Sequence, residues 1–128
     1  MFVKEWMSRG LITVAPNATL DEALKLMETN KIRRLPVVDG GKLVGIVTDR
    51  DLMKVSPSPA TTLSKYELNY ILEKIIIKDI MSKKLYTINQ NSTIEEAALI
   101  LFNEKIGGIP VVEDSGAIVG VITETDLF

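Results

Sequence analysis

Hydrophobic and polar positions follow a helical period in two stretches of the chain. Apolar residues recur at helical spacing over residues 20–27 and again over residues 94–101. Each stretch follows the S/T-x-x-E pattern of a capping box, formed by Thr19 with Glu22 and by Thr93 with Glu96. The pattern predicts one amphipathic helix in each half, and we interpret its apolar face as core rather than as a ligand surface.

Short β-branched runs follow each helix and predict a pair of strands. Residues 35–38 and 43–47 are separated by a turn with two glycines, and the second half turns through residues 113–116. Glycine supplies the positive φ of a tight hairpin turn. Because proline cannot donate to a strand ladder, we expect Pro36 and Pro110 at strand starts or sheet edges. Short first strands at 12–14 and 86–88 complete the predicted order strand, helix, strand, strand, helix.

The two halves align as an internal repeat. The pentapeptide at residues 4–8 (KEWMS) returns at 78–82 (KDIMS), and the shift grows by one residue after the hairpin. We therefore predict repeats over 1–56 and 77–128 and a connector over 57–76. The connector is turn-like at 56–59 and then helical, from the capping box of Ser64 and Glu67.

One repeat alone is too small to bury both faces of its sheet. We therefore expect the two repeats to pack on each other through their sheets about a pseudo-twofold axis. The predicted fold class is mixed α/β (α+β), built from two β-α-β-β-α units.

Composition narrows the possible chemistry. The 128 residues are 46% hydrophobic, and the net charge of −2 gives no general attraction to nucleic acid. We see neither an apolar run long enough to span a bilayer nor a signal-peptide pattern, so we expect a cytoplasmic protein without membrane or nucleic-acid partners. The chain contains no cysteine and no histidine, which excludes disulfides, thiolate zinc sites and imidazole catalysis. We expect neither an enzyme nor a metal site.

Each repeat has one constellation with possible binding chemistry. A β-branched run ends in threonine and an aspartate follows three residues later, as Thr48 with Asp51 and as Thr123 with Asp126. The threonine hydroxyl and the N–H groups of a helix start can donate to phosphate, and the carboxylate can accept from ribose hydroxyls. The same residue types are also preferred helix caps, so the sequence leaves both roles open.

Taken together, the repeated Met-Ser, the Pro-Val-Val strand and the Thr-x-x-Asp end resemble a tandem pair of CBS domains over nearly the whole chain. The connector residues 60–70 further resemble those of acetoin-utilisation-type proteins. The resemblance implies a non-catalytic regulatory module that binds an adenosyl ligand such as AMP, ADP, ATP or S-adenosylmethionine, without an obligatory cofactor. It also implies a homodimer and signalling to a fused or partner regulatory domain.

The resemblance further implies which residues line the ligand clefts. Arg33 and Arg34 match positions that can reach ligand phosphates, whereas the second repeat has Gly107 and Gly108 there, so we expect unequal clefts. Solvated surface arginines are the alternative. The candidate ligand-binding residues are Thr13, Arg33, Arg34, Leu35, Pro36, Thr48, Asp51, Thr87, Ile109, Pro110, Thr123 and Asp126.

Two expectations remain open at this point. The sequence ends soon after Asp126, so we expect the second repeat's last helix to be missing or supplied by residues outside this sequence, which puts the Thr123–Asp126 site in doubt. A structural dimerisation module, pairing through the apolar helices and binding no ligand, is the alternative function.

Overall fold

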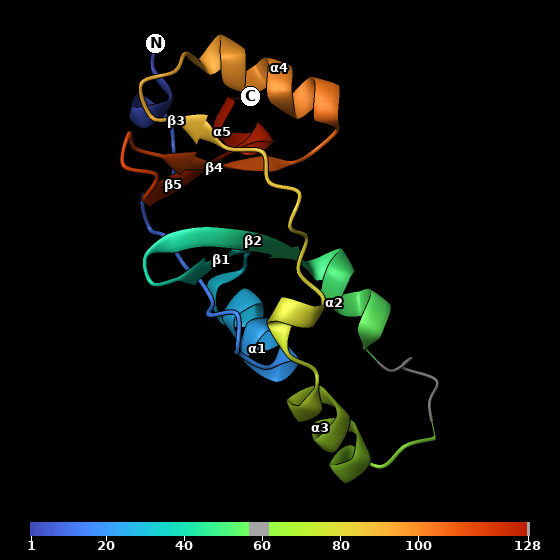
Figure 1. Cartoon of the computed structure of the whole chain (residues 1–128). Coiled ribbons are helices and arrows are strands. Elements are labelled where there is room, and N and C mark those ends of the chain that lie inside the picture. Colours follow the sequence, from blue (N-terminus) through green and yellow to red (C-terminus); the bar gives the residue numbers. More distant parts are fainter. Residues whose placement is uncertain (57–61, 128) are drawn as a thin grey trace. The chain divides into compact units, whose positions relative to one another are not determined.

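A computed structural model describes residues 1–56 and 62–127 (Figure 1). The chain divides into two compact units. The first-repeat unit comprises Ile12–Asp39 and Val44–Lys84, and the second-repeat unit comprises Met1–Leu11, Gly40–Leu43 and Leu85–Phe128. Of the turn predicted at 56–59, residues 57–59 lie outside the described residues.

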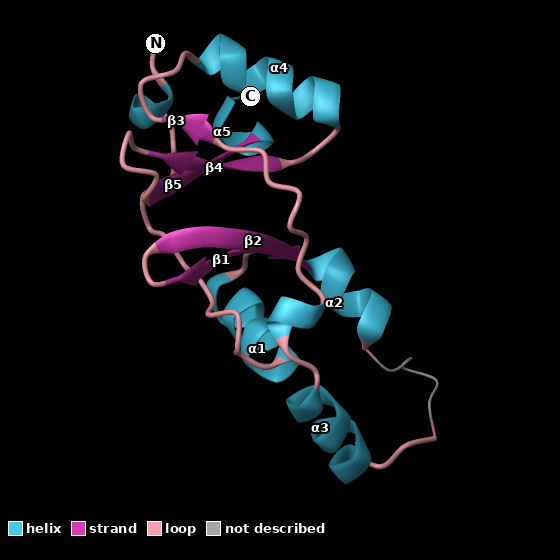
Figure 2. Ribbon diagram, viewed as in Figure 1, coloured by secondary structure: helices cyan, strands magenta, loops and turns pink. Residues whose placement is uncertain are grey.

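The first-repeat unit contains a hairpin covered by helices (Figure 2), although the turn of the hairpin and the start of its second strand, Gly40–Leu43, belong to the second-repeat unit. Strands β1 (Arg34–Asp39) and β2 (Lys42–Thr48) pair, and the isolated residue Val14 pairs in parallel with Val37. The predicted glycine turn is confirmed, because Gly40 and Gly41 have φ angles of 58° and 83°. The helices are α1 (Leu20–Asn30), α2 (Asp49–Val55), α3 (Lys65–Lys74) and the 3₁₀ turn η2 (Ile77–Asp79).

The second-repeat unit contains a three-stranded sheet in the order β3-β4-β5. Strand β3 (Ile88–Asn89) is parallel to β4 (Gly108–Val112), which is antiparallel to β5 (Ile118–Thr123). The unit also holds η1 (Val3–Glu5), α4 (Ile94–Glu104) and α5 (Glu124–Leu127). The turn α5 comprises four residues, compared with seven in α2, and the expectation that the rest of this last helix is missing or supplied from outside this sequence stays a prediction.

The predicted helices and mixed α/β class are confirmed. Thr19 and Thr93 cap α1 and α4, their hydroxyls accepting from the backbone N–H groups of Glu22 and Glu96 at 3.2 Å each. Ser64 and Glu67 form the reciprocal capping box predicted for the connector helix. The packing of the two repeats through their sheets stays a prediction.

Each proline is the third residue of its strand. The prediction holds for Pro36, because β1 is an edge strand of its two-stranded sheet, but it was wrong for Pro110. Pro110 lies in the central strand of its sheet. A proline is tolerated at these positions because the neighbouring parallel segment is short. The register of β3 on β4 begins only at Ile88 with Val111, and in the first-repeat unit the ladder begins where Val14 donates to the Pro36 carbonyl. At neither proline does the parallel partner extend far enough to require the missing N–H.

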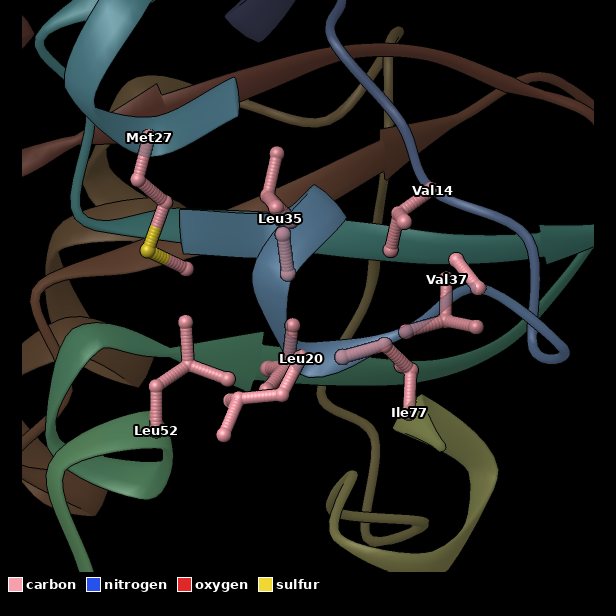
Figure 3. Close-up of a cluster of buried hydrophobic side chains, with 10 residues drawn as sticks. Val14, Leu20, Met27, Leu35, Val37, Leu52 and Ile77 are labelled. Atoms are coloured by element: carbon pink, nitrogen blue, oxygen red, sulfur yellow. The ribbon is translucent and has the colours of Figure 1, made fainter. Parts of the chain in front are cut away.

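Each hydrophobic core is completed by a segment from the start of the other repeat. Val3 and Met7 are buried in the core of the second-repeat unit, whereas Ile77 is buried in the core of the first. Figure 3 shows Leu20 of α1 between Leu52 of α2 and Ile77. The compact units therefore do not coincide with the sequence repeats predicted at 1–56 and 77–128.

We call the segments around Ser8 and Ser82 the exchanged segments. Each of them packs against a glycine in a strand of its unit. Ser8 exchanges two backbone hydrogen bonds with Val121 of β5, and Ser82 does the same with Ile46 of β2. A Cβ added to the neighbouring Gly120 would lie 2.7 Å from the Ser8 carbonyl oxygen and 2.9 Å from the Met7 sulfur. The repeated Met-Ser motif thus requires a strand residue without a side chain.

We predict that Gly120→Ala lowers the free energy of unfolding by about 1–3 kcal/mol, because the hydrogen-bonded backbone at Ser8 must shift to admit the methyl group. Urea unfolding measures the difference. Gly10→Ala is the matched control, since a Cβ there meets nothing within 4 Å. Equal stability of both variants would contradict the close docking of the N-terminal segment.

Candidate functional site

Thr48 and Asp51 join the end of β2 to the start of α2. The Thr48 N–H donates to Oδ2 of Asp51 at 2.9 Å, and the Asp51 N–H donates to the Thr48 hydroxyl at 3.3 Å. This is a reciprocal capping box, so the capping role considered from the sequence is confirmed. The ligand role is a separate matter, because a cap does not use every polar group of the pair.

The pair keeps binding capacity beyond the cap. The hydrogen bond of the cap is accepted by Oδ2 of Asp51, so the cap does not use Oδ1. The Thr48 hydroxyl accepts a hydrogen bond and donates none within residues 1–56 and 62–127. Both side chains are half-buried, and the cap holds their orientation. A carboxylate oxygen that can accept and a hydroxyl that can donate are therefore presented together.

The second repeat reproduces the pair with one difference. The Thr123 N–H donates to Oδ2 of Asp126 at 2.8 Å, and the Asp126 N–H donates to the Thr123 hydroxyl at 3.4 Å. The Thr123 hydroxyl additionally donates to Oδ2 of Asp126 at 3.1 Å. The doubt raised by the sequence about this junction is answered in part, since the turn of α5 forms and the pair is in place.

The other predicted residues of the first repeat lie on the same unit. Arg33 adjoins the pair, because its carbonyl accepts from the Asp49 N–H at 2.8 Å, and its side chain is exposed. Thr13 precedes Val14, which bonds to the Pro36 carbonyl. Arg34 is half-buried at the start of β1, whereas Leu35 and Pro36 are fully buried. Leu35 is a core residue, so a ligand would meet it through its backbone.

The second-repeat residues follow the same plan. Gly107 accepts from the Glu124 N–H at 3.1 Å, the counterpart of the Arg33 bond. Thr87 is exposed and directly precedes β3. Ile109 and Pro110 are buried in β4, and Ile109 belongs to the core. The roles of all twelve predicted residues in ligand binding stay predictions, although each set lies within one unit.

Two charged residues next to the first pair are not among the residues predicted from the sequence. Asp49 is half-buried and Arg50 exposed, and both stand between Thr48 and Asp51. Their charge and their position next to the pair were the features of the sequence that could have made them candidates. The corresponding residues of the second repeat are Glu124 and Thr125.

Three kinds of feature are absent from the described residues. Among residues 1–56 and 62–127, no polar or charged side chain is buried and no cluster of acidic side chains is arranged to hold a metal ion. In the same part of the chain, no helix combines the length and apolar character needed to cross a bilayer. The cellular compartment stays a prediction.

Comparison with known proteins identifies the family. The CBS domain matches residues 3–58 and 77–128. A CBS domain-containing protein of Dictyostelium discoideum is 38% identical over 128 residues, which cover 99% of this chain and 88% of that protein. The chain belongs to the CBS domain family and carries two CBS repeats.

An enzyme also contains a similar region. Inosine-5′-monophosphate dehydrogenase of Korarchaeum cryptofilum is 36% identical over 127 residues. That match covers 98% of this chain but only 23% of the dehydrogenase. The similarity therefore concerns a minor part of that enzyme.

Solved structures agree with the assignment. The CBS domain pair of protein MJ0100, solved with 5′-methylthioadenosine and S-adenosylmethionine, has a TM-score of 0.81 and 30% identity, covering 99% of this chain and 92% of that one. A putative acetoin utilization protein from Vibrio cholerae has a TM-score of 0.82 and 30% identity, with coverages of 99% and 87%. CBSX2, solved with AMP, has a TM-score of 0.81 and 28% identity, with coverages of 98% and 92%.

Proposed function

We propose that this CBS pair is a regulatory module that binds an adenosyl ligand and catalyses no reaction. The observation that carries the proposal is the capped pair of Thr48 and Asp51, which holds a hydroxyl donor and a carboxylate acceptor side by side. The vicinal hydroxyls of ribose are donors suited to Oδ1 of Asp51, and the Thr48 hydroxyl suits a phosphate or ribose oxygen.

The similar structures support this ligand class. MJ0100 was solved with two adenosyl compounds and CBSX2 with AMP, at 30% and 28% identity to this chain. Their shared ligand chemistry is an adenosine moiety with different 5′ substituents. We assign the same moiety to this chain, with AMP, ADP, ATP and S-adenosylmethionine as candidate ligands.

The proposed site can couple binding to packing because its residues come from several segments. Arg33 precedes β1, Thr48 ends β2 and Asp51 lies in α2, whose Leu52 is buried in the core. A ligand that bridges these segments favours the arrangement in which all of them reach it. The ligand can shift the equilibrium between two arrangements by at most the difference between its binding free energies to them. A fused or partner domain that contacts the module then receives the signal.

We predict that calorimetric titration of the chain with AMP, ADP, ATP and S-adenosylmethionine detects binding of at least one, and that Asp51→Asn weakens it roughly tenfold to hundredfold. The variant removes a charged acceptor, and hydrogen bonds to charged groups are the stronger ones. An asparagine oxygen can still accept from Thr48, so the cap is kept.

Asp39→Asn is the matched control, because Asp39 is an exposed aspartate at the end of β1. It should leave the affinity unchanged. A folded protein that binds none of the four compounds, or an equal loss in both variants, would overturn the proposed site.

A homodimer is the second part of the proposal, and α4 carries the observation that favours it. Leu99 and Phe102 are 60% and 82% exposed and lie one helical turn apart. The equivalent positions of α1 are the polar residues Lys25 and Glu28. An apolar pair of this kind on one helix is suited to contact with a second copy of the chain.

We predict that Phe102→Glu raises the dimer dissociation constant roughly thirtyfold or more, because aromatic anchors dominate interface energetics. Analytical ultracentrifugation measures it. Tyr66→Glu is the control, since Tyr66 is 89% exposed on the connector helix α3. A monomeric wild type, or a dimer equally weakened by both variants, would contradict the role of α4. A dimer whose stability is the same with and without the adenosyl ligands would favour the purely structural module.

A further inference from the structure

The two candidate sites are built on the same backbone plan but differ in charge. In each site, the backbone N–H of the residue after the threonine donates to a backbone carbonyl. That carbonyl belongs to the residue directly before the first strand of the hairpin. Asp49 donates to Arg33 at 2.8 Å, and Glu124 donates to Gly107 at 3.1 Å. Positions 33 and 107 are therefore structurally equivalent, and a difference in their side chains changes the site without changing its framework.

The charge difference extends over the neighbouring positions. The first site contains two carboxylates, Asp49 and Asp51, together with three arginines at 33, 34 and 50. The second contains two carboxylates, Glu124 and Asp126, and no basic residue at the equivalent positions. Arg33 and Arg50 are exposed, and within the described part of the chain Arg33 forms no salt bridge. Guanidinium groups suit phosphate oxygens, whereas two uncompensated carboxylates repel them.

The threonine hydroxyls differ in the same direction. The Thr123 hydroxyl donates to Asp126 at 3.1 Å, whereas the Thr48 hydroxyl donates to no group among residues 1–56 and 62–127. A phosphate oxygen only accepts hydrogen bonds, so it needs a donor that is not already engaged. The first site offers such a donor in addition to its arginines, and the second site does not.

We propose that the two repeats select ligands by charge, an inference that rests on the proposed function. The first-repeat site binds an adenosyl ligand that carries phosphate. The second-repeat site excludes phosphate and binds a neutral or cationic adenosyl ligand. Both ligand classes occur in the similar solved structures, AMP with CBSX2 and 5′-methylthioadenosine with MJ0100. Each repeat of this chain thus binds one of these two ligand classes.

The test titrates the full chain with AMP and with 5′-methylthioadenosine, which differ at the 5′ position. Wild type should bind one AMP per chain. Arg33→Gly should weaken AMP roughly tenfold to hundredfold and leave 5′-methylthioadenosine unchanged. Asp51→Asn should weaken AMP alone, and Asp126→Asn should weaken 5′-methylthioadenosine alone.

Two gain-of-function variants transfer the arginines to the second repeat. Gly107→Arg should raise the stoichiometry to two AMP per chain. Gly107 is not among the glycines with positive φ in the described residues, which are Gly40, Gly41 and Gly116, so its backbone conformation does not require glycine. Thr125→Arg, the counterpart of Arg50, places the charge on an exposed position and serves if Gly107→Arg fails to fold.

The outcomes separate this inference from the proposed function. Two equivalent AMP sites in wild type, competition of both compounds for one site, or no gain in either folded arginine variant would overturn selection by charge while leaving adenosyl binding intact. Absence of binding by both compounds and also by ADP, ATP and S-adenosylmethionine would overturn the proposed function as well.

Discussion

The fold depends on the closure of each hydrophobic core by a segment from the start of the other sequence repeat. Val3 and Met7 are buried against the sheet of β3, β4 and β5, and Ile77 is buried against the β1–β2 hairpin. A single repeat would leave this surface open, since a unit of about 50 residues buries too little on its own. Gly45 and Gly120 make the docking possible, because any side chain there would meet the backbone or the methionine of the incoming segment.

The same docking provides a physical basis for the proposed regulatory function. The capped threonine and aspartate lie at the ends of β2 and β5, the two strands that receive the exchanged segments. A ligand held there contacts strands whose position depends on residues distant in the sequence. Binding energy that differs between two packing arrangements is sufficient for regulation, and no chemical step is needed.

Periodicity, capping patterns and turn glycines predicted α1, α4, α3 and the first hairpin, because these features are decided by local interactions. The exchange of segments was not predictable, since the Met-Ser motif is common to both repeats and local sequence does not specify which sheet receives it. The sequence located both threonine–aspartate pairs. It did not reveal that Leu35 and Ile109 are core residues, because their neighbours in space come from other segments.

The measurement that tests the central claim most directly is an amide NMR titration of the isotopically labelled chain with AMP. Adenosyl binding at the first-repeat site predicts saturable shifts of the Thr48 and Asp51 amides, whose N–H groups form the reciprocal cap. Saturable binding that leaves these amides unshifted would place the ligand elsewhere. A spectrum unchanged by AMP, ADP, ATP and S-adenosylmethionine would contradict the assignment of this module as an adenosyl sensor.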